Sequence, residues 1–206
     1  DRAGLLIIDV SYPQDPLLLG SHETLDMSFS ITIVGAIAYV ADFYAGLKII
    51  DVSNPKSPVL LGSYDTPEYA CSVTVLSKIA YVAVGDAGLQ IIDVSIPQSP
   101  LLLGSILPHH NSYIHSCTIQ GGRLYVSDTG WNEISVYNLS IPYSPELIRT
   151  YAWNLSTMNM CIHDNTLYNA NYHYGLSIHD MNAVDITDDV LVDVPQHGLN
   201  IFPNPF

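Results

Sequence analysis

The chain repeats itself about every 42 residues, and no other feature restricts its possible folds as strongly. One pattern, a Gly-Leu pair followed four residues later by Asp, occurs at residues 4–11, 46–53, 88–95 and 175–182, with a divergent copy at 133–140. The aspartate position falls at Asp9, Asp51, Asp93, Asn138 and Asp180, so the spacings are 42, 42, 45 and 42. A tyrosine marker at residues 39, 81, 125 and 168 keeps the same step. Two markers in step indicate a repeat architecture.

Each repeat is typical of four β-strands. Segments rich in β-branched residues at 31–34, 73–76, 117–120 and 160–163 predict the first strand, and short turns lead from them into the tyrosine strand. The Gly-Leu pattern supplies the third strand. The fourth follows a turn with prolines at 13/16, 55/58, 97/100 and 142/145. Taken alone, each Pro-x-x-Pro also fits the ligand of a polyproline-binding domain. Its recurrence at one position of the repeat favours a turn.

Four-stranded units that stack side by side predict an all-β fold, a β-propeller built from blades of about 42 residues. The Leu-x-Ile-Ile-Asp strands at residues 5–9, 47–51 and 89–93 resemble the LVIVD-repeat family, and the resemblance extends from residue 1 to about 182. The fourth copy departs from the pattern at Asn138, and the fifth copy lacks the prolines. The resemblance implies a propeller on bacterial or archaeal surface proteins and brings no common reaction or cofactor with it.

The predicted blades lie near residues 1–22, 23–66, 67–108, 109–153 and 154–195, so the propeller covers 1–195 and about four to five blades are present. The first blade lacks its first two strands, and the fifth has three clear strands with a degenerate fourth near Val190–Val194. Closing the ring with four blades would leave the Gly175–Asp180 strand without a place. We therefore expect a fragment of a larger propeller.

Residues 196–206 break the repeat. The end of the chain, Gly198 to Phe206 with its Pro-Asn-Pro, resembles the opening of a type IX secretion C-terminal sorting domain. That resemblance implies export across a bacterial outer membrane, an extracellular or cell-surface location, and the secretion machinery as a partner of the tail. The alternative is an Asn-Pro turn in a linker.

The charge balance narrows the set of partners. Six Lys and Arg face twenty Asp and Glu, a net charge of −14, which disfavours nucleic acid and anionic membranes because both need clustered cations. No apolar stretch has the roughly 18–20 residues of a transmembrane segment. Together with the location that the resemblances imply, this balance leads us to expect an extracellular protein or glycan as the partner.

Sites for metals and for chemistry are weakly indicated. Catalytic signatures such as H-E-x-x-H and G-x-S-x-G are missing. We expect the side chains of Asp9, Asp51 and Asp93 to cap turns. We expect the three cysteines to be isolated small residues of the core, at positions Cys71, Cys117 and Cys161. We expect His115 to pack between blades. The acidic run Asp185, Asp188, Asp189 and Asp193 favours a solvated linker over a Ca²⁺ site. No catalytic residue, metal or cofactor is predicted.

The loops between second and third strands and the loops between blades must share one face of a propeller. These loops carry aromatic and histidine residues, among them both tryptophans of the chain. Both length irregularities, within 106–113 and 126–133, also fall on this face. Since binding sites concentrate on loops over rigid scaffolds, we expect the ligand-binding residues to be Tyr44, Glu68, Tyr69, His109, His110, Tyr113, Asp128, Trp131, Trp153, Tyr172 and His173.

The sequence thus favours a secreted or cell-surface β-propeller that acts as a non-enzymatic interaction module. Two alternatives stay open. One is a hydrolase or lyase that uses His109, His110, Asp128 or His173 around the channel mouth. The other is a structural spacer within a larger surface protein, which predicts no concentrated patch.

Overall fold

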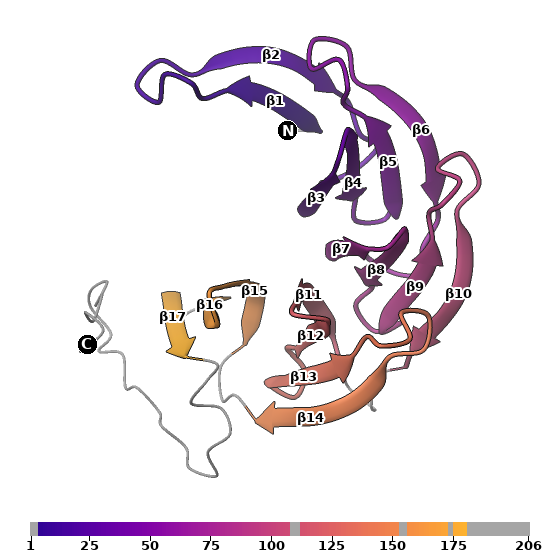
Figure 1. The fold of residues 1–206 in the computed structure, drawn as a ribbon, viewed down its shortest axis with the longest axis vertical. Coiled ribbons are helices and arrows are strands. Elements are labelled where there is room, and N and C mark those ends of the chain that lie inside the picture. Colours follow the sequence, from indigo (N-terminus) through magenta and orange to yellow (C-terminus); the bar gives the residue numbers. More distant parts are fainter. Residues whose placement is uncertain (1–3, 108–111, 153–155, 173–174, 181–206) are drawn as a thin grey trace.

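The computed structural model describes residues 4–107, 112–152, 156–172 and 175–180. In these residues seventeen strands form five antiparallel sheets, arranged side by side along an open arc (Figure 1). The described residues contain no helix that could span a membrane. The all-β propeller arrangement predicted from the repeats is therefore confirmed.

The five sheets follow the five repeats. The first sheet has two strands, the next three have four strands each, and the last has three. Their strands are β1 (Leu5–Asp9) and β2 (Leu17–His22); β3 (Ser30–Val34), β4 (Ile37–Ala41), β5 (Leu47–Asp51) and β6 (Val59–Tyr64); β7 (Ser72–Leu76), β8 (Ile79–Ala83), β9 (Leu89–Asp93) and β10 (Leu101–Ile106); β11 (Ile114–Gln120), β12 (Arg123–Asp128), β13 (Glu133–Asn138) and β14 (Glu146–Ala152); β15 (Thr157–His163), β16 (Thr166–Asn171) and β17 (Gly175–Asp180).

Strands neighbouring in sequence pair with one another, so each four-stranded sheet is a simple meander. The first strand of each repeat (β3, β7, β11 and β15) lies on the inside of the arc, and β2, β6, β10 and β14 lie on the outside (Figure 1). The expected absence of two strands from the first blade and the three clear strands of the fifth are both confirmed. The segment Val190–Val194 lies outside the described residues.

The hydrophobic core lies between the sheets because alternate side chains of each strand point toward the neighbouring sheet. The marker tyrosines carry this packing: Tyr39 packs with Val73 and Val82 of the next sheet, and Tyr81 packs with Leu124 and Val126 of the sheet after it. The largest fully buried side chains include Tyr81, at 0% exposure. The tyrosine repeat is therefore a packing repeat.

The two-stranded first sheet leaves part of its neighbour uncovered. Ile31 and Ile33 of β3 are 45% and 61% exposed. Val73, the equivalent of Ile31 in the next sheet, is buried and packs with Tyr39 of β4. This exposure follows from the missing pair of inner strands and agrees with a fragment of a larger propeller.

The repeated aspartates cap turns, as the sequence predicted. The carboxylates of Asp9, Asp51 and Asp93 each accept a hydrogen bond from the backbone N–H two residues later, at 2.8 Å. Asn138 makes the same bond to the Ser140 N–H at 3.0 Å. These hydrogen bonds from the following serine hold the pKa of Asp9, Asp51 and Asp93 below the usual range.

Candidate ligand-binding face

Antiparallel meanders place their turns on two opposite faces. We call the face with the second-to-third-strand turns and the connections between sheets the loop face. The opposite face, with the first-to-second and third-to-fourth turns, is the hairpin face. We call the contact between the β3–β6 and β7–β10 sheets the first junction, and the contact between the β7–β10 and β11–β14 sheets the second junction.

An aromatic cluster of Phe29, Phe43, Tyr44 and Tyr69 occupies the loop face at the first junction. The Phe43 ring stacks on Tyr69, with centroids 4.4 Å apart and planes 9° apart, and on Phe29 at 5.1 Å. Tyr44 meets Phe43 and Tyr69 edge-on at 4.8 and 4.5 Å. The two tyrosine hydroxyls share a hydrogen bond of 2.8 Å. These are the favourable aromatic geometries, so the four rings form one unit.

The backbone turn between β4 and β5 holds this cluster in place. Phe43 has a φ of 45°, in the left-handed region, where a residue other than glycine is strained by about 1–2 kcal/mol. Its carbonyl accepts a hydrogen bond from the Ala70 N–H at 3.0 Å, which ties the turn to the next sheet. The buried Asp42 carboxylate accepts hydrogen bonds from Leu25 N–H and the Ser28 hydroxyl.

The cluster is open to solvent. Tyr44 is 64% exposed and Phe29 is 45% exposed, and no strand of the described chain covers them. The hydrogen bond with Tyr44 raises the pKa of Tyr69, and the charges of Glu68 and Asp86 raise it further. Both carboxylates are exposed. The cluster is thus an apolar aromatic surface set in a negative field.

The second junction has the same backbone and a different surface. Gly85, with a φ of 48°, takes the place of Phe43, and its backbone pairs with Ile114 as Phe43 pairs with Ala70. The Tyr113 ring lies over Gly85, 3.1 Å from where a β-carbon would stand. Its hydroxyl is 3.8 Å from the Cys71 sulfur. Burial raises the pKa of both Tyr113 and Cys71. Tyr113 therefore closes this junction.

Asp128, Trp131 and Tyr172 lie on the loop face farther along the arc. The Asp128 Oδ1 atom accepts hydrogen bonds from the backbone N–H groups of Tyr113, Gly130 and Trp131 at 2.9–3.2 Å. Asp128 thus orders the turn that presents Trp131, which is 52% exposed. Tyr172 is 65% exposed.

Four of the predicted residues, His109, His110, Trp153 and His173, lie outside the described residues. Of the rest, the structure brings Tyr44 and Tyr69 together, with Glu68 beside them, and leaves Tyr113, Asp128 and Trp131 at a different junction. His115 packs between sheets as predicted: it is half-buried and its Nδ1 lies 2.6 Å from the Met158 carbonyl oxygen.

The site prediction omitted Phe29 and Phe43, which complete the cluster. Phe43 lies next to Tyr44 in the same turn. Phe29 directly precedes an inner strand, and the equivalent residues in later repeats are Cys71, His115 and Met158. Comparing such positions across the repeats is the signal that identifies Phe29 as unusual.

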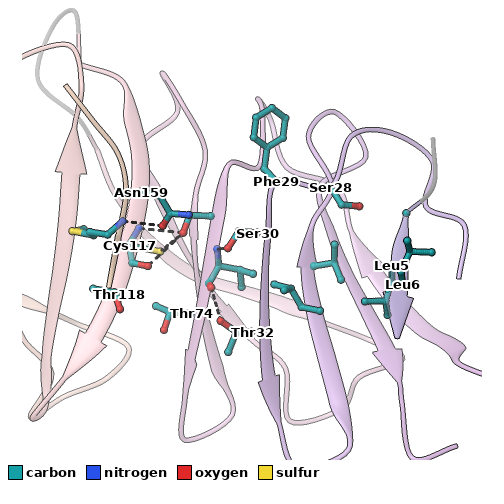
Figure 2. Close-up of a pocket in the computed structure, with 16 residues that line it drawn as sticks. Leu5, Leu6, Ser28, Phe29, Ser30, Thr32, Thr74, Cys117, Thr118 and Asn159 are labelled. Carbon is teal, nitrogen blue, oxygen red and sulfur yellow. Dashed lines mark hydrogen bonds between the residues drawn. The ribbon is translucent and has the colours of Figure 1, made fainter. Parts of the chain in front are cut away.

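Beside the cluster, the inside of the arc forms an open hollow of about 510 Å³. Figure 2 shows Phe29 at its upper rim, Leu5 and Leu6 of β1 on one side, and Thr118 and Asn159 on the other. Most of its polar side chains already bind backbone: Thr32 donates to the Val73 carbonyl at 2.8 Å, and Ser72 accepts from the Cys117 N–H at 3.2 Å. Of the side chains that line it, only Cys117 ionises, and burial raises its pKa to about 12.

The three cysteines are free thiols. Cys71 and Cys117 are buried, as expected of small core residues, but the prediction was wrong for Cys161, which is exposed. Cys161 lies on the face of the β15–β17 sheet that has no neighbouring sheet among the described residues. Within those residues, no three His, Cys, Asp or Glu side chains come together as a group that would hold a metal ion.

The LVIVD repeat matches residues 1–24, 27–66 and 67–107, about half of the chain. The chain belongs to the LVIVD-repeat family. Its matched repeats contain β1 to β10, and therefore the whole aromatic cluster. No curated protein sequence matches this LVIVD-repeat chain.

Solved structures agree on the fold. The chain is similar to the Myceliophteria thermophila Cps50 (Swd1) β-propeller domain, with a TM-score of 0.61, 14% identity, and coverage of 84% of this chain and 61% of that one. It is similar to a putative 6-phosphogluconolactonase from Bacteroides fragilis, with a TM-score of 0.66 and 14% identity, over 80% of this chain and 56% of that one. It is also similar to the computationally designed Ika8 protein, with a TM-score of 0.63 and 12% identity, over 86% of this chain and 52% of that one. The LVIVD-repeat chain thus spans between 52% and 61% of these structures.

Proposed function

We propose that this LVIVD-repeat propeller is a non-enzymatic interaction module that binds a protein or glycan through its loop face. The observation that supports the proposal is the exposed aromatic cluster at the first junction. Aromatic side chains dominate recognition surfaces because they offer a large rigid contact area at a small cost in conformational entropy. The propeller supplies the rigid support that such a surface needs.

The strained turn at Phe43 supports the same assignment. The equivalent position holds Gly85 in the next repeat, which adopts the left-handed conformation without a side-chain penalty. Phenylalanine at this place costs stability, and its ring stacks within the partly exposed cluster. Residues held in such conformations cluster at functional sites.

The cellular context belongs to the proposal as well. We place the module outside the cell, on a bacterial surface or in the surrounding medium, on the resemblance of Gly198–Phe206 to a type IX secretion sorting domain. The secretion machinery is then the partner of the tail.

The test is a binding screen of the 206-residue chain against a glycan library and a library of tethered peptides. A Phe29→Ala/Tyr44→Ala variant is screened beside it. The matched control is Tyr12→Ala/Tyr143→Ala, which removes two rings that are 78% and 61% exposed on the hairpin face. We expect the cluster variant to lose at least about tenfold in affinity for the hits while the control keeps them. Equal binding by both variants overturns the proposal.

A further inference from the structure

In the described residues, the loop face carries several carboxylates and neither Lys nor Arg. Glu23, Asp65, Glu68 and Asp86 are exposed there, and Asp26 is partly exposed. Among the described residues, the connections that build this face, 23–29, 42–46, 65–71, 84–88, 112–113 and 129–132, contain no Lys or Arg.

The cations of the described chain lie elsewhere. Lys56, Lys78 and Arg123 are at turns of the hairpin face, Lys48 is buried in β5, and Arg149 is in the outer strand β14. The hairpin face therefore mixes both signs of charge, whereas the described part of the loop face carries only negative charge. Such an asymmetry attracts partners of the opposite sign and speeds their encounter.

The aromatic cluster lies within this one-signed region. Glu68 directly precedes Tyr69, and the charges of both Glu68 and Asp86 act on the Tyr69 hydroxyl. Ring faces attract cations, and a cation over an exposed ring gains about 0.5–1 kcal/mol. Carboxylates beside the rings add charge-assisted hydrogen bonds, which Arg makes in pairs. The rings and the carboxylates thus favour the same kind of ligand group.

We propose that the aromatic cluster binds a basic peptide segment, with Arg or Lys side chains lying on Phe29 and Tyr44 and paired with Glu68 and Asp86. This inference rests on the proposed function and names its ligand class. A neutral glycan also stacks on aromatic rings and donates hydroxyl hydrogen bonds to carboxylates, but it gains no attraction from their net charge. The charge pattern therefore favours the basic peptide.

The test measures the binding of a fluorescein-labelled peptide of alternating Arg and Gly, with a matched Glu-Gly peptide and a neutral cello-oligosaccharide as comparison probes. Titrations are run at about 0.1 M salt and at about 1 M, where the Debye length falls from about 10 Å to about 3 Å. We expect the Arg peptide alone to bind, with at least about a tenfold loss of affinity at high salt.

Two charge variants locate the site. Glu68→Gln/Asp86→Asn removes two charges beside the cluster, and Asp15→Asn/Glu146→Gln removes two exposed charges from the hairpin face. Both change the net charge equally. We expect the first to weaken binding of the Arg peptide about threefold to tenfold and the second to leave it within about twofold.

Other results overturn the inference. They are equal binding of the Arg and Glu peptides, insensitivity to salt, equal effects of the two charge variants, or no binding of the Arg peptide. If the Phe29→Ala/Tyr44→Ala variant still loses a library hit, such as the oligosaccharide, the interaction module stands and only its ligand class is wrong. If that variant loses nothing, the proposed function fails too.

Discussion

The first and second junctions have the same backbone architecture and differ in which parts are open. At the first junction the loop face is open, with Phe43 stacked between Phe29 and Tyr69. At the second, Tyr113 folds over Gly85 and closes the corresponding place. Toward the hairpin face the relation reverses: Gly62 of β6 fits tightly against the Pro97 turn of the next sheet, whereas Gly104 of β10 has open space around it.

The comparison shows how a repeat separates packing from recognition. The paired strands and the marker tyrosines are shared: Tyr39 and Tyr81 are buried at successive junctions. The surface is set by three positions at which the repeats differ: Phe29, Phe43 and Tyr44 in one repeat, and Cys71, Gly85 and Asp86 in the next. Substitutions at the glycines test this separation directly.

The largest effect is expected from Gly62→Ala. An added β-carbon would stand 2.1 Å from the Pro97 carbonyl oxygen, far inside van der Waals contact, and the obstacle is backbone that cannot turn aside. The first junction then has to open. We expect a loss of about 2–3 kcal/mol in the free energy of unfolding, measured by urea denaturation.

Gly104→Ala is the matched control at the second junction. Nothing lies within 4 Å of its ideal β-carbon, and Arg149 already occupies the equivalent position in the next repeat. We expect a change within about 0.5 kcal/mol. Similar losses in both variants would show that the two junctions do not differ at the outer strand.

A smaller effect is expected from Gly85→Ala, which tests the closed part of the second junction. The substitution meets the Tyr113 ring at 3.1 Å and places alanine at a φ of 48°. Gly121→Ala has a similar φ of 57° but open space, so it carries the backbone strain alone, about 1 kcal/mol. We expect Gly85→Ala to lose about 1 kcal/mol more than Gly121→Ala in urea denaturation. Identical losses would mean that the ring moves aside freely.

Much of this fold was predictable because a repeat states its structure several times. The strand order, the two-stranded first sheet and the aspartate turn caps were all inferred from aligned positions, and each is confirmed. Tyr39, Tyr81 and Tyr125 keep step because each fills the same space between sheets. A packing constraint that recurs leaves a periodic trace in the sequence.

The candidate site was less predictable because it depends on departures from the repeat. Placing Tyr44, Glu68 and Tyr69 on the loop face needed only strand order, but joining them to Phe29 needed the geometry of the junction. Asp128 appeared as a candidate ligand contact, and its role as an acceptor for three backbone N–H groups follows from a turn conformation that spacing does not specify. Cys161 was misplaced because its exposure depends on whether a neighbouring sheet covers it.

The smallest expected effect extends the comparison to the next junction, where His115 takes the position of Phe29 and Cys71. Burial lowers the pKa of His115 below its ordinary value of 6.5, and burial lowers that of His179 to about 4. Both histidines are therefore neutral in the folded chain at a pH where the unfolded chain already binds protons. The contribution of these two histidines to stability is constant above about pH 7 and is lost as the pH drops from 6.5 toward 4.

This window is separate from that of the capping aspartates. Their lowered pKa values stabilise the fold above the ordinary value of 3.8, and this contribution is lost only as the pH falls below it. Changes in the urea midpoint between pH 7 and 4.5 therefore report mainly on the two half-buried histidines, His115 and His179. We expect His115→Gln to flatten the dependence of the urea midpoint on pH relative to the unsubstituted chain. The free energy involved should be smaller than the losses expected for Gly62→Ala and Gly85→Ala. His163→Gln, whose side chain is 78% exposed, should keep the slope, since exposed charges contribute little. An unchanged slope in His115→Gln would place the titrating group elsewhere in the chain.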